Sequence, residues 1–164
     1  MNILQIATIA ALVLPVPMAF AQDAATPAAF AAEAGSSNMF EIESSQLALE
    51  RSKEEMVRSF AQQMVTDHTA AGEKMKAAAQ KDGVEVPAAL SAAHQGVLDA
   101  LKGENDDGFD DAYIEAQIKA HDQAVGLFSA FAKAHPSTAL GAFAAATLPT
   151  LEEHQTHVHQ MRGK

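Results

Sequence analysis

The chain has 164 residues, a formal net charge of −10 and no cysteine. A surface of this sign repels phosphate backbones, and no basic stripe offsets the repulsion, so the composition argues against nucleic-acid binding. Without cysteine there is no disulfide framework and no attachment site for a bacterial lipoprotein anchor. The sequence also lacks a nucleophile elbow and a glycine-rich phosphate loop, which argues against a hydrolase or a transferase.

The N-terminus predicts a secretory signal peptide over residues 1–21. An apolar run over residues 3–16 is followed by Ala-Phe-Ala at residues 19–21, an A-x-A cleavage pattern, and then by polar Gln22. Two prolines interrupt the run, and a membrane anchor would need about 20 apolar residues. We therefore expect an exported protein, periplasmic or envelope-associated. Its single mature domain spans residues 22–164 and contains no integral membrane segment.

The rest of the chain reads as all-helical, because alanine, leucine, glutamate, lysine and glutamine dominate and β-branched runs are absent. Apolar residues recur three or four apart in five segments, which is the spacing of an amphipathic helix. Four long helices, one short helix and short connections predict an up-and-down four-helix bundle with one additional short helix. The predicted helices span residues 27–50, 52–81, 87–103, 108–133 and 137–161.

Several helix ends have recognisable signals. Thr26 is expected as an N-cap with Pro27 at the first helical position, and Ser52 with Glu55 has the spacing of a capping box. Pro149 interrupts the last helix and predicts a kink. An acidic cluster at residues 104–111 could bind calcium weakly. It is better explained as the start of a helix, where Asp106 or Asp107 would cap and acidic charge is stabilising.

Histidines on the apolar faces are the main candidates for chemistry. His68, His121 and His154 lie on the apolar sides of three predicted helices, and Glu41 points the same way from the first. Ionisable groups are rarely placed in a core without a partner, and neutral imidazole is the commonest ligand for transition metals. These four residues are therefore the candidates for an interior site that holds zinc, copper or iron. For His94 we expect only a core residue satisfied by a carbonyl or water.

The rise of about 1.5 Å per residue tests whether these side chains are level. We assume that the turn after the first helix and the turn before the last helix lie at one end of the bundle. Depths from that end are then about 14 Å for Glu41, 21 Å for His68, 18 Å for His121 and 27 Å for His154. This predicts a three-residue site, with His154 too deep unless the Pro149 kink or a helix stagger corrects it.

The C-terminal histidines offer a second candidate. His154 and His157 are one helical turn apart and could chelate a metal, while His159 projects elsewhere. A solvated polar tail explains the same residues, and we expect that.

One segment carries a family resemblance. Residues 60–69, Phe-Ala-Gln-Gln-Met-Val-Thr-Asp-His-Thr, resemble the F-A-x-x-M-V-x-D-H-T signature of a family of exported bacterial ferritin-like proteins. That family is catalogued as a domain of unknown function or "predicted outer membrane protein". The similarity continues at Phe40-Glu41-Ile42-Glu43, Leu47-Ala48, His94-Gln95, Phe109-Asp110, Tyr113, His121, Leu148-Pro149-Thr150-Leu151 and Glu153-His154.

The resemblance implies a ferritin-like bundle with a metal site at Glu41, His68, His121 and His154. Di-iron proteins of that fold carry Glu-x-x-His on two helices. Here the residues three before the histidines are instead Val65, Ile118 and Leu151, which argues against di-iron oxygen chemistry.

The function expected from the sequence is metal binding or envelope stress protection without catalytic turnover. Two alternatives stay open. One is a metal-dependent redox enzyme, and the other is a structural or partner-binding bundle that holds no metal. The expected partners are a metal ion and either a second copy of the chain or an envelope component.

Overall fold

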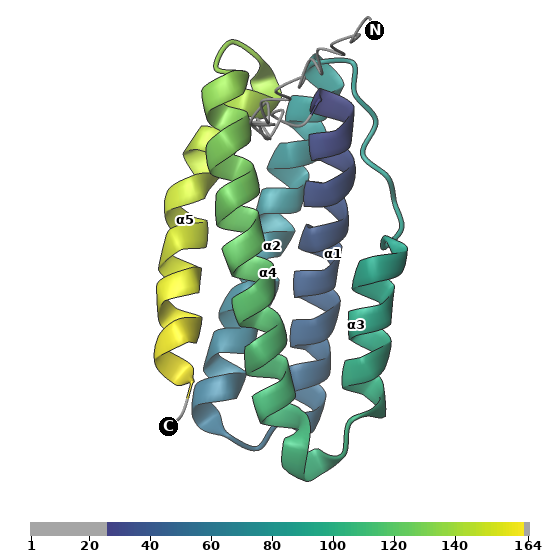
Figure 1. Cartoon of the computed structure of the whole chain (residues 1–164), viewed down its shortest axis with the longest axis vertical. Helices are drawn as coiled ribbons and strands as arrows, with labels where there is room; N and C mark the ends of the chain where they lie inside the picture. The colour runs from purple at the N-terminus through teal and green to yellow at the C-terminus, as the bar shows by residue number, and fades with distance from the viewer. Residues whose placement is uncertain (1–25, 163–164) are drawn as a thin grey trace, which may run out of the picture.

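The computed structural model describes residues 26–162, which form five helices and no strand. The helices are α1 (Pro27–Arg51), α2 (Glu55–Lys81), α3 (Ala92–Gly103), α4 (Asp106–Ala134) and α5 (Ala139–Met161). The four long helices form a bundle, and α3 lies outside it against α1 and α4 (Figure 1). The predicted all-α fold of four long helices and one short helix is confirmed. The predicted signal peptide and its cleavage site lie outside the described residues.

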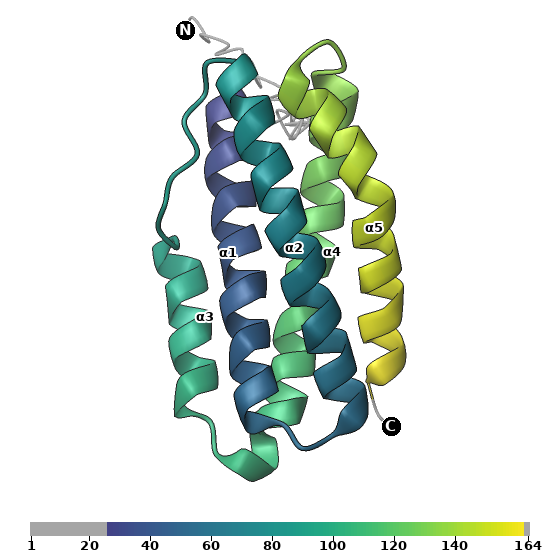
Figure 2. The same ribbon diagram turned by 180° about the vertical axis from the view of Figure 1, so that it is seen from behind.

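The course of the chain decides which helix ends meet. Each helix runs opposite to the one before it, so α3 and the segment before it return the chain along the side of the bundle (Figures 1 and 2). Arg51 at the end of α1 binds Asp106 at the start of α4, with 2.8 Å between Nη2 and Oδ1. At the other end, the Asp82 carboxylate just after α2 accepts hydrogen bonds from the backbone N–H groups of Ala139 and Leu140, at 2.9 and 2.7 Å. The turn between α4 and α5 therefore lies at the opposite end from the turn between α1 and α2. The shared end assumed from the sequence was wrong.

The helix caps agree with the sequence at α1 and differ at α2. Thr26 is the N-cap of α1, and its side chain accepts from the Ala29 N–H at 3.2 Å. The predicted capping box at Ser52 does not form, because α2 begins at Glu55 with no side-chain cap. Ser52 instead ends α1, and its hydroxyl accepts from the Glu54 N–H at 3.2 Å. Only three residues connect α1 to α2, so Ser52 lies in the turn and cannot cap α2.

The starts of α3 and α4 also lie elsewhere than predicted. Ser91 caps α3, which begins five residues later than expected, and Asn105 caps α4. Asp106 and Asp107 lie in the first turn of α4, where the helix dipole stabilises negative charge.

The extended segment before α3 packs closely on α1. A Cβ atom at Gly35 would lie 2.8 Å from Cγ1 of Val86, so glycine permits this approach. On α3 itself, Leu98 is buried, whereas the neighbouring Val97 is 42% exposed.

The core consists of two apolar clusters at different heights. One contains Phe40, Phe60, Met64 and Tyr113, and the other contains Phe30, Phe128, Phe131 and Phe143. Along α2, α4 and α5, a buried histidine lies between the part of the helix that enters one cluster and the part that enters the other. His68 lies on the buried face of α2, as its apolar spacing predicts, together with Met64 and Met75, while Arg58, Gln62 and Lys76 are exposed. Among the helices described, none has the length and apolar character needed to cross a membrane.

Candidate metal centre

Four polar side chains lie at one height in the bundle. Measured from the end where α1 and α5 begin, Glu41 lies 14 residues into α1 and His154 15 residues into α5. From the same end, where α2 and α4 finish, His68 and His121 each lie 13 residues from the helix terminus. At 1.5 Å per residue, all four depths are about 20–22 Å. His154 thus reaches the level of the others because α5 starts at the opposite end from that assumed.

The three histidines form a compact group in the core. One ring nitrogen from each of His68, His121 and His154 lies within 4.8 Å of the other two. The ring centroids are 5.5 to 5.8 Å apart, and the residues are 7%, 1% and 1% exposed. Among residues 26–162, no other group of three histidines and carboxylates has this geometry.

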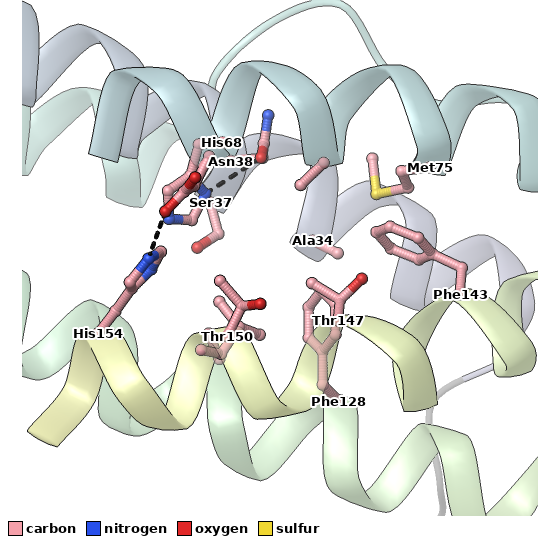
Figure 3. A pocket seen from close by; sticks show the side chains of 14 residues that line it. Ala34, Ser37, Asn38, His68, Met75, Phe128, Phe143, Thr147, Thr150 and His154 are labelled. Atoms are coloured by element: carbon pink, nitrogen blue, oxygen red, sulfur yellow. Dashed lines mark hydrogen bonds and ion pairs between the residues drawn. The ribbon is translucent and has the colours of Figure 1, made fainter. Parts of the chain in front are cut away.

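Each imidazole uses one nitrogen for a hydrogen bond to an oxygen acceptor. His68 Nδ1 lies 3.1 Å from Oδ1 of Asn38 (Figure 3), and His121 Nδ1 lies 2.9 Å from the carbonyl oxygen of Gln117. His154 Nε2 lies 2.9 Å from Oδ2 of Asp67. Because the acceptors carry no proton, the histidine nitrogens donate in all three bonds.

The second nitrogen of each ring is left with a lone pair. These atoms are Nε2 of His68, Nε2 of His121 and Nδ1 of His154, and each is buried without a hydrogen-bond partner. Buried polar atoms are usually paired, so three unpaired atoms in one small group require an explanation. The group could hold a metal ion.

Glu41 lies behind His121 rather than within this group. Its Oε1 is 3.7 Å from Nδ1 of His121, the nitrogen that faces the Gln117 carbonyl. The carboxyl is 2% exposed, and burial raises its pKa, although His121 and Gln117 act in the opposite direction. The structure therefore brings together three of the four predicted residues and places the fourth next to one of them.

Burial also sets the charge of two of the imidazoles. It lowers the pKa of His68 well below 6.5, and His121 and His154 lower it further. It lowers the pKa of His154 as well, although the hydrogen bond to Asp67 acts in the opposite direction. Both rings are therefore neutral at pH 7, as metal ligands must be.

The other histidines lie apart from this site. His94 is buried as expected, with Nδ1 2.6 Å from Oγ of Ser36. His159 binds Asp122 on the surface at 2.9 Å, and the ring of His157 packs edge-on against Phe60. The C-terminal histidines therefore do not form a chelating set.

The sequence reasoning missed the residues that hold the rings in place. Asn38 and Gln117 give no pattern that marks them out, because a side-chain amide and a backbone carbonyl are common everywhere. Asp67 could have been identified from the sequence, because it directly precedes His68 in the segment that carries the family resemblance.

A family model described as "Domain of unknown function (DUF4142)" matches residues 15–161. The chain belongs to this family. The DUF4142 match spans all five helices and every residue of the histidine group. No curated protein and no solved structure matches the chain. Membership of DUF4142 agrees with the unknown-function part of the resemblance and assigns no activity.

Proposed function

We propose that this protein binds a divalent transition metal through His68, His121 and His154. The observation that carries the proposal is the set of three buried, unpartnered ring nitrogens within one small group. Leaving a buried acceptor unpaired costs about 1–3 kcal/mol. A single metal ion would satisfy all three acceptors at once.

The surroundings of the rings support a metal rather than a water molecule. Asp67 accepts from the outward nitrogen of His154, and Glu41 stands 3.7 Å from the outward nitrogen of His121. Carboxylates behind metal-binding histidines fix the ring orientation and raise the basicity of the ligand. Two carboxylates also match the charge of a divalent ion.

The donor set narrows the choice of metal. Imidazole suits zinc, copper and iron, whereas magnesium and calcium prefer oxygen ligands. A tetrahedral zinc ion with bonds of 2.0–2.1 Å places its ligand nitrogens about 3.3 Å apart. The nitrogens of the three rings lie within 4.8 Å of one another, so they would have to approach by up to about 1.5 Å to bind such an ion. We propose zinc, copper or iron, and not a di-iron pair.

The role we propose is metal binding without turnover, in the periplasm or at the envelope, after removal of the signal peptide. Sequestering a redox-active metal there would protect the envelope from metal-catalysed damage. This compartment rests on the N-terminal sequence, and the metal rests on the core geometry, so the two proposals can fail separately.

A metal-dependent redox enzyme is the second candidate. Three protein ligands leave at least one coordination position free, which is the arrangement of catalytic rather than structural zinc sites. Turnover requires a redox metal at the site, so zinc as the native ion would exclude this candidate.

Thermal unfolding with added metal tests the proposal. Apo protein without an affinity tag should gain about 2.7 kcal/mol of stability when free metal is 100-fold above its dissociation constant. His121→Asn should abolish most of the gain and keep the helical circular dichroism. His159→Asn is the matched control, because it removes an exposed histidine outside the group, and it should respond like the wild type.

Elemental analysis of protein purified from its native compartment would identify the ion. If zinc, copper and iron all leave the wild-type melting temperature unchanged, no metal binds. The histidines would then be polar parts of an ordinary core in a structural or partner-binding bundle.

A further inference from the structure

A small cavity borders the histidine group. Its volume is about 30 Å³, and it lies between the four long helices on the side of His68 and His154. Figure 3 shows these two rings at one end of the cavity and the side chains of Met75 and Phe143 toward the other. His121 does not line it.

The cavity walls are mostly apolar. Carbon atoms from all four long helices form nearly all of its exposed wall, although Ser37, Asn38, Asp67, Thr147 and Thr150 also line it together with the two histidines. The main apolar contributors are Ala34, Ala71, Met75, Ala124, Phe128 and Phe143. Apolar cavities in proteins exclude water, which needs two to four polar partners, and they accept small neutral molecules.

The volume limits what the cavity can hold. One water-sized body needs about 10–15 Å³ of the same measure, so a cavity of about 30 Å³ accepts roughly two such bodies. That is the size of a diatomic molecule and too small for an organic substrate.

We propose that this cavity binds a neutral diatomic molecule, of the class of dioxygen, nitric oxide and carbon monoxide, beside the open position of the metal. The location of the cavity carries the proposal. Two of the three rings that offer lone pairs also form its wall, so a molecule inside lies beside two of the residues that would hold the ion. The contact with a metal rests on the proposed function, whereas the affinity of the cavity for an apolar gas does not.

Xenon binding to the metal-free protein tests the cavity alone. We expect a saturable shift of the ¹²⁹Xe resonance with the wild-type chain and its loss in Ala71→Leu, because the larger side chain fills the space. Ala77→Leu is the matched control, since Ala77 is exposed on the same helix, and it should behave like the wild type. Ala124→Leu fills the cavity from α4 and serves in place of Ala71→Leu if circular dichroism shows that the latter does not fold. Equal xenon binding by the wild type and a folded filled variant would overturn the proposal.

Carbon monoxide with the copper(I)-loaded protein tests the contact with the metal. The wild type should show one infrared band of bound carbon monoxide per copper. The filled variant should hold the same amount of copper and lose the band. If the wild type binds copper but neither xenon nor carbon monoxide, the proposed gas binding is wrong and the proposed metal site is still supported. A wild type that binds xenon but no copper supports the cavity, and the proposed function fails instead.

Discussion

Each core histidine is held in one tautomer by the oxygen that accepts its outward N–H. Asn38 holds His68, the Gln117 carbonyl holds His121, and Asp67 holds His154. The three oxygens come from a side-chain amide, the backbone and a carboxylate, and only the carboxylate can lose its charge in a substitution that keeps the shape of the side chain. Asp67 is therefore the most informative position outside the histidines themselves.

We expect Asp67→Asn to weaken metal binding roughly 10–100-fold, the usual effect of losing an outer partner of a ligand histidine. An amide can donate to Nε2 of His154, which would move the ring proton to Nδ1 and block the nitrogen that faces the group. Calorimetric titration with zinc measures the change. Asp122→Asn, which alters the partner of exposed His159, should bind metal like the wild type. Equal affinities in the two variants would remove Asp67 from the site.

The stability of the metal-free protein should fall as the pH is lowered. Burial holds the pKa of His68 well below its value of 6.5 in the unfolded chain, so the unfolded state takes up protons first. The contribution of neutral His68 is therefore fully present above about pH 6.5 and is lost as the pH falls toward the folded-state pKa. His121 and His154 face the ring from α4 and α5 and oppose its protonation, while the carboxyls of Glu41 and Asp67 are close to those two.

Melting temperatures of metal-free protein between pH 8 and pH 5 measure this loss. His68→Gln should reduce the slope of the profile, because glutamine does not titrate, and should leave the part that comes from the lowered pKa of His154. His159→Gln, at an exposed position, should keep the wild-type slope below pH 6.5. A wild-type profile as flat as that of His68→Gln would show that burial of this ring does not control the acid response.

At the scale of elements, the buried faces of most helices could be predicted from the sequence, whereas which helix ends meet in the bundle could not. Apolar spacing identified the buried sides of α2 and α4 because it depends only on the helical repeat. The direction of α5 depends on whether the segment between α2 and α4 runs back along the side of the bundle. Local sequence patterns do not predict the path of such a connection. Because the start of α5 was assigned to the wrong end of the bundle, His154 was placed about 27 Å deep, whereas it is level with His68 and His121.

The Asp82 carboxylate joins the end of α2 to the first turn of α5 and so fixes that direction. Thr138 is the N-cap of α5, and Asp82 accepts from two further N–H groups of its first turn, so Asp82→Ala should lower the free energy of unfolding by about 1 kcal/mol, as the loss of a capping side chain does. Urea denaturation measures the loss. Asp99→Ala is the control, because Asp99 binds only exposed Gln95 on its own helix, and we expect a change well below that of Asp82→Ala. Similar losses in both would mean that the contact between α2 and α5 contributes little.

On the scale of the whole molecule, the two apolar clusters stabilise the bundle. A polar layer, formed by Glu41, His68, His121 and His154, lies between them. Composition predicted the all-helical core, because strong helix formers dominate the chain and β-branched runs are absent. The sequence identified the four residues of this layer as candidates, but not which of them lie in contact. Which three of them meet depends on contacts between helices far apart in the sequence.

Expression of the full sequence in a bacterial host with a periplasm should yield a processed chain that begins at Gln22. Small residues at both ends of the Ala-Phe-Ala triplet fit the signal peptidase site. Intact-mass measurement of the periplasmic fraction decides the point. Recovery of an unprocessed chain in the membrane fraction would contradict the proposed compartment.

The histidine group draws together positions that are remote along the chain. His68 and His121 are 53 positions apart, and His121 and His154 are 33 apart. A bound ion would therefore act as a cross-link between three helices, closing two long loops. Its release would require α2, α4 or α5 to separate from the others. The residence time of the ion would then follow the slow opening of the bundle, and amide hydrogen exchange along α5 would slow when metal is added.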